Sequence, residues 1–147
     1  MLHHLSFAVA DLARSAAFYD AVLSALGYVR VWSDDTAIGY GLAGGGDRFA
    51  IKLRSRKIPV PGDGFHVAFS APSRQAVDAF YKAALEQGGK DNGGSGLHPE
   101  YGSRYYAAFV FDPDGYRVEA VESIEDSGFD GPEIELASSP CSMPPGW

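Results

Sequence analysis

Two stretches of the chain have the same order of hydrophobic and polar positions. In residues 2–10 (LHHLSFAVA) and 65–71 (FHVAFSA), bulky side chains stand at every second position, which predicts a half-buried strand in each. A polar residue that can cap a helix follows each stretch, Asp11 in the first and Ser73 in the second. Hydrophobic residues then recur at helical spacing until a glycine ends each segment.

The two stretches are copies of one module. A shift that places His4 on His66 also places Phe18-Tyr19 on Phe80-Tyr81, without a gap between them. Such a repeat determines how the chain is organised, and the individual elements are therefore assigned within each copy. Each copy therefore begins with a strand and continues into a helix.

Three further extended segments complete each copy, which gives two βαβββ modules. They are residues 28–33, 37–42 and 48–54 in the first module, and residues 90–95, 105–111 and 116–122 in the second. A tight turn is predicted at residues 112–115 (DPDG), because proline presets one φ angle and glycine accepts the strained position. The predicted fold class is α+β, with the two modules forming a curved mixed sheet around a cavity.

The modules together make one domain of residues 1–122, which is a usual size for a single core. The first module spans residues 1–54, the second spans 64–122, and residues 55–63 (SRKIPVPGD) link them. Residues 123–147 are rich in Ser, Pro and Gly, and we expect a tail that is poorly ordered or packed on the surface.

Strand parity separates a packing face from a cavity face in each module. In the first strand the bulky residues face one way, whereas His4 faces the other way together with small residues. His66 does the same in the second module, and the last strands turn Lys52 and Glu119 to the same face. Small residues leave space above a sheet, so these four side chains are expected to converge on a cavity.

His4, His66 and Glu119 make a candidate metal triad, with two imidazole nitrogens and one carboxylate oxygen as donors. Such a set suits a divalent ion of Fe, Mn, Zn, Ni or Co and leaves coordination positions for water or substrate. A lone strand histidine is more often a hydrogen-bonded structural residue. Here the repeat favours a metal site, because it places two histidines at equivalent positions.

Composition and charge exclude several classes of function. The formal net charge is −7 and basic residues gather only at 54–57 (RSRK), a solvated strand end, so no nucleic-acid partner is expected. The longest apolar run, residues 105–111, is far too short for a membrane span, and no signal peptide is visible. A single cysteine, Cys141, excludes an intrachain disulfide and suits a reducing compartment, so we expect a soluble cytoplasmic protein.

The paired modules, the opening HHLSFAVADLARSAAFYDAVLSALGY and the closing YYAAFVFDPDGYRVEAV resemble the vicinal oxygen chelate superfamily. This superfamily includes glyoxalase I, extradiol dioxygenases, fosfomycin resistance enzymes and bleomycin resistance proteins. The stretch FHVAFSAPSRQAVDAFYKAALEQGGKDNG resembles a glyoxalase-like branch of bacterial and fungal proteins. The resemblance covers residues 1–122 and implies the fold but not the reaction, because proteins with the same fold can catalyse different reactions.

The resemblance also implies metal ligands on the first strand of each module and on the last strand of one or both. Those positions are His4, His66 and Glu119 here. Glyoxalase I has a fourth ligand, Glu or Gln, where this chain has Lys52, and this departure argues against glyoxalase I activity. Members often complete their pockets with a partner chain, so the resemblance implies a homodimer.

Lys52 leaves several interpretations open. Its ammonium group could pair with Glu119 and take the place of the metal, bind an anionic substrate, or keep a metal-bound water deprotonated. It could also extend along the cavity rim with its charge in solvent. Lys52 and Glu119 are therefore the candidate catalytic residues.

The candidate substrate-binding residues surround the penultimate strand. They are His98, Tyr101, Arg104, Tyr105 and Tyr106. One of the two adjacent tyrosines faces the cavity by strand parity, and packing is the alternative role for each. His98 lies in a glycine-rich loop, either at the surface or as an acid–base histidine.

Two functions follow from these observations. The first is a metal-dependent enzyme acting on a small oxygenated molecule, of the lyase or isomerase, dioxygenase or transferase type, and it depends on the triad. The second is a metal-free protein of the bleomycin resistance type that binds or sequesters a small molecule, and it depends on Lys52 at a ligand position. Both predict a concave pocket between the modules, and they differ on the metal.

Overall fold

The computed structural model describes residues 2–122, and the predicted tail of residues 123–147 lies outside the described residues. The first module contains β1 (Leu5–Val9), α1 (Leu12–Ala25), β2 (Val29–Ser33), β3 (Ala37–Gly41) and β4 (Phe49–Leu53). The second contains β5 (Val67–Ser70), α2 (Arg74–Glu86), β6 (Lys90–Asp91), β7 (Gly96–Leu97), β8 (Tyr106–Phe111) and β9 (Arg117–Glu122). The α+β class and the two modules predicted from the sequence are confirmed.

Each module forms its own mixed sheet. In the first sheet the strand order is β1-β4-β3-β2, and in the second it is β5-β9-β8-β6, with β7 also paired to β8. The first strand of each module runs parallel to the last strand, whereas the other pairs are antiparallel. β1 and β5 are therefore edge strands of their sheets within the described residues.

One predicted strand is shorter than expected. Residues 90–95 were expected to be a single extended segment, but β6 ends at Asp91, and the next strand, β7, begins only at Gly96. The backbone turns after Asp91, where Gly93 adopts a φ of 128° and its N–H donates to the Asp91 carboxylate at 2.9 Å. This Asx turn ends the regular strand, although the Asn92 N–H and the Gly93 carbonyl still bond to Phe109 of β8.

Both helices begin where the sequence predicts. Asp11 accepts a hydrogen bond from the backbone N–H of Arg14 at 2.9 Å, and Ser73 accepts one from Ala76 at 3.1 Å. These bonds satisfy N–H groups that have no partner inside the helix. The same capping geometry at equivalent positions confirms that the two modules are structural repeats.

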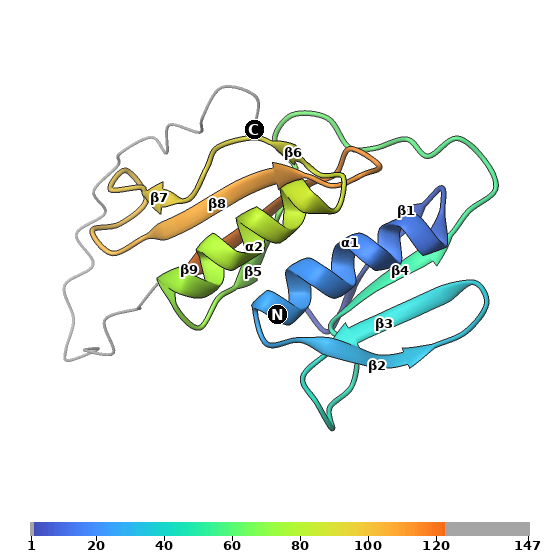
Figure 1. Ribbon diagram of the computed structural model, residues 1–147. Helices are drawn as coiled ribbons and strands as arrows, with labels where there is room; N and C mark the ends of the chain where they lie inside the picture. The colour runs from blue at the N-terminus through green and yellow to red at the C-terminus, as the bar shows by residue number, and fades with distance from the viewer. Residues whose placement is uncertain (1, 123–147) are drawn as a thin grey trace.

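The two helices lie side by side on one side of the molecule, with the sheets behind them (Figure 1). The bulky strand residues pack beneath the helices into one core that both modules share. Phe7 of β1 stacks on Tyr116 of the second module with ring centroids 4.0 Å apart, and both rings are buried. The packing face predicted from strand parity is therefore confirmed.

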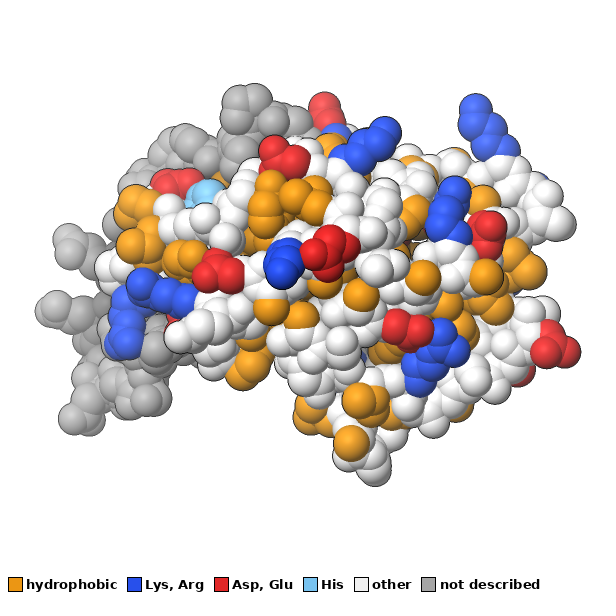
Figure 2. Space-filling view, in the orientation of Figure 1, with side chains coloured by type: hydrophobic (Ala, Val, Ile, Leu, Met, Phe, Trp, Pro, Cys, Tyr) orange, Lys and Arg blue, Asp and Glu red, His pale blue; other side chains and the backbone are white. Residues whose placement is uncertain are grey.

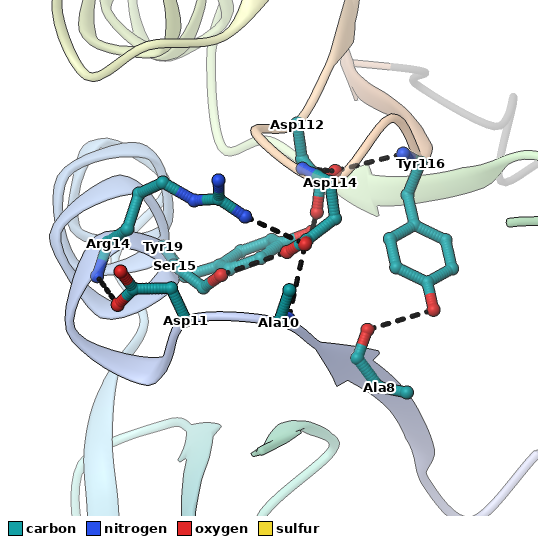
Figure 3. A network of polar contacts seen from close by, with 9 residues as sticks. All are labelled: Ala8, Ala10, Asp11, Arg14, Ser15, Tyr19, Asp112, Asp114 and Tyr116. Carbon is teal, nitrogen blue, oxygen red and sulfur yellow. Dashed lines mark hydrogen bonds and ion pairs between the residues drawn. The ribbon is translucent and has the colours of Figure 1, made fainter. Parts of the chain in front are cut away.

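The predicted DPDG turn also joins the modules (Figure 3). Gly115 has a φ of 98° and donates to the Asp112 carbonyl at 3.0 Å, which closes the turn. The Asp114 side chain accepts hydrogen bonds from Arg14 at 2.8 Å and from Ser15 at 3.0 Å, both on α1. The turn of the second module is thus tied to the helix of the first.

The helix side of the molecule carries charges of both signs. Figure 2 shows Lys and Arg side chains interspersed with Asp and Glu on this face rather than gathered into a patch of one sign. Among the described residues, no helix combines the length and the apolar character that crossing a membrane requires. The cytoplasmic location stays a prediction.

Candidate functional site

Glu119 is a buried carboxylate on the sheet face that the helices leave open. It lies at the centre of β9, paired with Ala68 on one side and Phe109 on the other, and only 1% of it is exposed. Tyr105 donates its hydroxyl to Oε1 of Glu119 at 2.5 Å, and Nε2 of His66 lies 3.3 Å from Oε2. The structure therefore brings together two of the three predicted metal ligands.

The surroundings shift the pKa values of both groups toward their neutral forms. Burial raises the pKa of Glu119, and the hydrogen bond from Tyr105 and the charge of His98 oppose that rise. Burial also lowers the pKa of His66, so its ring nitrogens are held without the second proton. The neutral imidazole is the form of His66 that binds a metal, whereas the raised pKa of Glu119 favours its protonated acid, which a bound cation would have to deprotonate.

An aromatic group covers the carboxylate side of this sheet. Tyr101 packs against Tyr105 with ring centroids 5.3 Å apart, and His98 contacts the Phe109 ring edge-on at 4.9 Å. His98 is half-buried in this group, and its Nδ1 lies 3.0 Å from the Glu100 carboxylate. The predicted Tyr101, Tyr105 and His98 thus lie on the side of Glu119.

Tyr106 and Arg104 lie elsewhere. Tyr106 points to the helix side, where its hydroxyl donates to Asp78 at 2.8 Å and the Arg74 guanidinium lies 5.2 Å from its ring. Neighbouring strand residues face opposite ways, so Tyr105 faces Glu119 and Tyr106 packs against α2. Arg104 is exposed in the turn before β8, and it forms no ion pair with the described residues.

His4 lies beside the first sheet, apart from the His66–Glu119 pair. It is exposed just before β1, and its Nδ1 lies 2.9 Å from Nδ1 of His3. Within residues 2–122, no group of three His, Cys, Asp or Glu side chains could hold a metal ion. One chain therefore does not assemble His4, His66 and Glu119 into a triad in its described part.

Lys52 lies on the open face of the first sheet, opposite Ala8 on β1 and Ala37 on β3. Parity predicts this placement. Within residues 2–122, the polar partners found for Glu119 are Tyr105 and His66, and Lys52 forms no ion pair with it. The interpretation in which Lys52 neutralises Glu119 is therefore not found within one chain.

Arg117 lies near Glu119. The sequence predicts which face of the strand it occupies but not its role. It stands two positions before Glu119 on β9, so both side chains face the same way. Its guanidinium donates to Asp63 at 2.5 Å and to the Pro61 carbonyl at 3.4 Å, which ties the linker to the second sheet. Its Nε is buried and has no hydrogen-bond partner among the described residues.

The comparisons with known proteins agree with this architecture. Residues 1–120 match the model of the Glyoxalase/Bleomycin resistance protein/Dioxygenase superfamily. The chain belongs to this superfamily. The resemblance stated from the two modules and their motifs is confirmed, and no curated protein matches the chain in sequence.

Solved structures of the superfamily share the fold. A glyoxalase/bleomycin resistance protein from Albidiferax ferrireducens T118 is similar at 30% identity and a TM-score of 0.69, covering 82% of this chain and 97% of that one. The fosfomycin resistance protein FosX from Listeria monocytogenes shares the fold at 17% identity and a TM-score of 0.61, covering 84% and 93%. A glyoxalase-related enzyme from Fulvimarina pelagi shares it at 20% identity and a TM-score of 0.61, covering 80% and 85%.

Proposed function

We propose that this superfamily member is a metal-dependent enzyme that acts on a small oxygenated molecule. The observation that carries the proposal is the buried Glu119 carboxylate next to His66 at 3.3 Å. A carboxylate that is 1% exposed is costly to keep charged without a cation, and within residues 2–122 it contacts a phenol and an imidazole. A divalent ion would supply the missing positive charge.

The donor set fits such an ion. His66 offers a neutral nitrogen and Glu119 an oxygen, which are donors that Zn, Ni, Mn, Fe and Co accept. When bound, the ion would polarise two neighbouring oxygens of a substrate. The protein would hold Glu119 in place through Tyr105.

A second copy of the chain would supply His4 as the third ligand. His4 stands before the first sheet, whereas Glu119 lies on the second, so a homodimer would be the arrangement that unites all three ligands. His4 is exposed next to β1, an edge strand within residues 2–122, and this supports the assignment. Each dimer would then contain two equivalent sites.

Metal content tests the proposal directly. The untagged protein is purified without chelator, and its metal is measured beside the variants His66→Ala and Glu119→Gln. We expect stoichiometric metal in the parent and loss in both variants, whereas His98→Ala serves as the matched control and keeps the metal. Absence of metal in the parent, with no thermal shift on adding Mn, Ni or Zn, would contradict the proposal.

Mixing variants tests the shared site. A dimer of one His4→Ala chain and one His66→Ala chain keeps one complete site, because His4 of the second chain meets His66 and Glu119 of the first. We expect each variant alone to lack metal and the mixture to regain about one ion per mixed dimer. A mixture that stays metal-free, despite exchange of subunits, would show that His4 is not the third ligand.

A metal-free binding protein is the second candidate, and Lys52 favours it. The ammonium group stands on β4 between Ala8 and Ala37, and it would repel any dication that came near it. The same metal measurements separate the two functions. A metal-free parent that still binds small molecules would establish the second one.

A further inference from the structure

A pocket with apolar walls lies at the junction of the modules, beside β1 and β5. Its volume is about 220 Å³. Side chains from both modules form the walls, namely Leu5, Leu23, Phe49, Val67 and Phe69. Neither His66 nor Glu119 lines it, whereas His4 does, so in the proposed dimer the pocket would adjoin the metal site that His4 completes.

Two tyrosines add only their rings to these walls. The Tyr28 hydroxyl donates to the Ser70 carbonyl at 3.2 Å, and the Tyr40 hydroxyl donates to Asp20 at 3.1 Å. Both hydroxyls are therefore already occupied. An apolar pocket of this kind favours a hydrocarbon group over water, because water would find few hydrogen-bond partners there.

Three other lining residues place nitrogen donors on the same pocket. They are His3, His4 and Arg48, and Arg48 is exposed. One N–H of the Arg48 guanidinium donates to the His3 carbonyl at 3.2 Å, and its other N–H groups have no acceptor within residues 2–122. The contact between the two histidine rings uses one Nδ1 from each and leaves both Nε2 atoms for other partners.

We propose that this pocket binds a small hydrophobic carboxylate, with its hydrocarbon group between the walls and its carboxylate on Arg48. The volume exceeds the cavity of about 150 Å³ that accepts benzene and is below that of a drug-sized site. An aromatic or branched group with a short acid arm therefore fits. A guanidinium binds a carboxylate through two parallel hydrogen bonds, which selects an acid over a neutral molecule of equal size.

Calorimetric titration of the full chain with phenylacetate tests this site, and 2-phenylethanol serves as the neutral comparison. The titrations contain EDTA, so metal at the other site cannot contribute. We expect phenylacetate to bind at least about tenfold more tightly than the alcohol, and Arg48→Met to remove that preference. Arg54→Met is the matched control, because Arg54 does not line the pocket and its guanidinium donates to the neighbouring Leu53 carbonyl.

Two further variants keep the test independent of folding and of the metal proposal. Ala68→Phe changes an exposed lining residue and is expected to block the pocket while leaving the thermal midpoint close to that of the parent. Ala68 pairs with Glu119, and the EDTA in the titrations keeps metal from affecting this comparison. His66→Ala is expected to lose metal without losing phenylacetate. No binding of phenylacetate at about 10 mM, equal binding of acid and alcohol, or full binding by Arg48→Met would each overturn the proposal.

Discussion

The phenol of Tyr19 on α1 donates a hydrogen bond of 2.7 Å to the buried carboxylate of Asp112 in the turn before β9 (Figure 3). The two residues belong to different modules, and only 3% of Asp112 is exposed. The other carboxylate oxygen accepts the backbone N–H groups of Asp114 and Tyr116, each at 2.9 Å. One aspartate thus shapes the turn and binds the neighbouring module.

This arrangement predicts a pH-dependent stability. Burial raises the pKa of Asp112 to about 6, so the folded state binds a proton more readily than the unfolded chain. The stabilising contribution is complete below the ordinary aspartate pKa and is lost as the pH rises through about 6. A rise of this size corresponds to about 3 kcal/mol.

Asp112→Asn tests the prediction, because the amide oxygen keeps the two backbone bonds and carries no charge. Between about pH 4 and pH 7.5, the free energy of unfolding of the variant should rise by about 1–3 kcal/mol relative to that of the parent, as measured by urea unfolding. His66, whose pKa burial lowers, has the opposite effect in this range, so only the difference between the two proteins is informative. An equal pH dependence in parent and variant would show that Asp112 does not titrate near neutrality.

Two tyrosine hydroxyls donate hydrogen bonds to equivalent carbonyls in the other module. Removing each hydroxyl should change the stability of the protein by a different amount. Tyr116 donates to the Ala8 carbonyl at 2.9 Å, and Tyr28 donates to the Ser70 carbonyl at 3.2 Å. The first bond is partly buried, so Tyr116→Phe should cost about 1 kcal/mol, whereas water can replace the exposed second bond and Tyr28→Phe should cost less than about 0.5 kcal/mol. Thermal unfolding of both variants measures the difference, and a larger loss for Tyr28→Phe would contradict this assignment.

Gly27 and Gly89 occupy equivalent positions but are required for different reasons. Gly27 has a φ of 87° and open space around it. At Gly89 a Cβ would lie 2.8 Å from both the Ala84 carbonyl oxygen and the Phe18 ring, and 3.0 Å from the Phe111 carbonyl oxygen. The positive φ after α2 belongs to Gly88, at 86°.

Substitution by alanine should separate these reasons. Gly89→Ala is expected to lose about 1–3 kcal/mol, because two of its neighbours are backbone atoms that cannot move aside. Gly27→Ala is expected to lower the free energy of unfolding by about 1 kcal/mol, from backbone strain alone. Gly46→Ala, which has open space and no positive φ, is the neutral control in the same unfolding measurement. A loss at Gly46 as large as at Gly89 would remove the packing explanation.

The face that each strand residue occupies followed from local pattern. Alternation along the strands assigned Glu119 and Lys52 to the open faces of their sheets and Phe7 and Val9 to the packing face, because successive side chains must point opposite ways. The same rule left the choice between Tyr105 and Tyr106 open, and the hydrogen bonds to Glu119 and Asp78 resolve it. The early end of β6 at Asp91 was missed because an Asx turn depends on one side-chain contact rather than on hydrophobic spacing.

The sequence by itself determined the two modules, their capped helices, the DPDG turn and the superfamily, because repeats, caps and turns are properties of neighbouring residues. Only the tertiary structure decided which distant groups meet. It placed His66 beside Glu119, left His4 beside the other sheet, and formed an apolar pocket with Arg48 among its lining residues. Strand parity fixes the direction in which a side chain points. The distance between the two modules depends on how their helices pack, and this packing cannot be predicted from the alternation of residues along the strands.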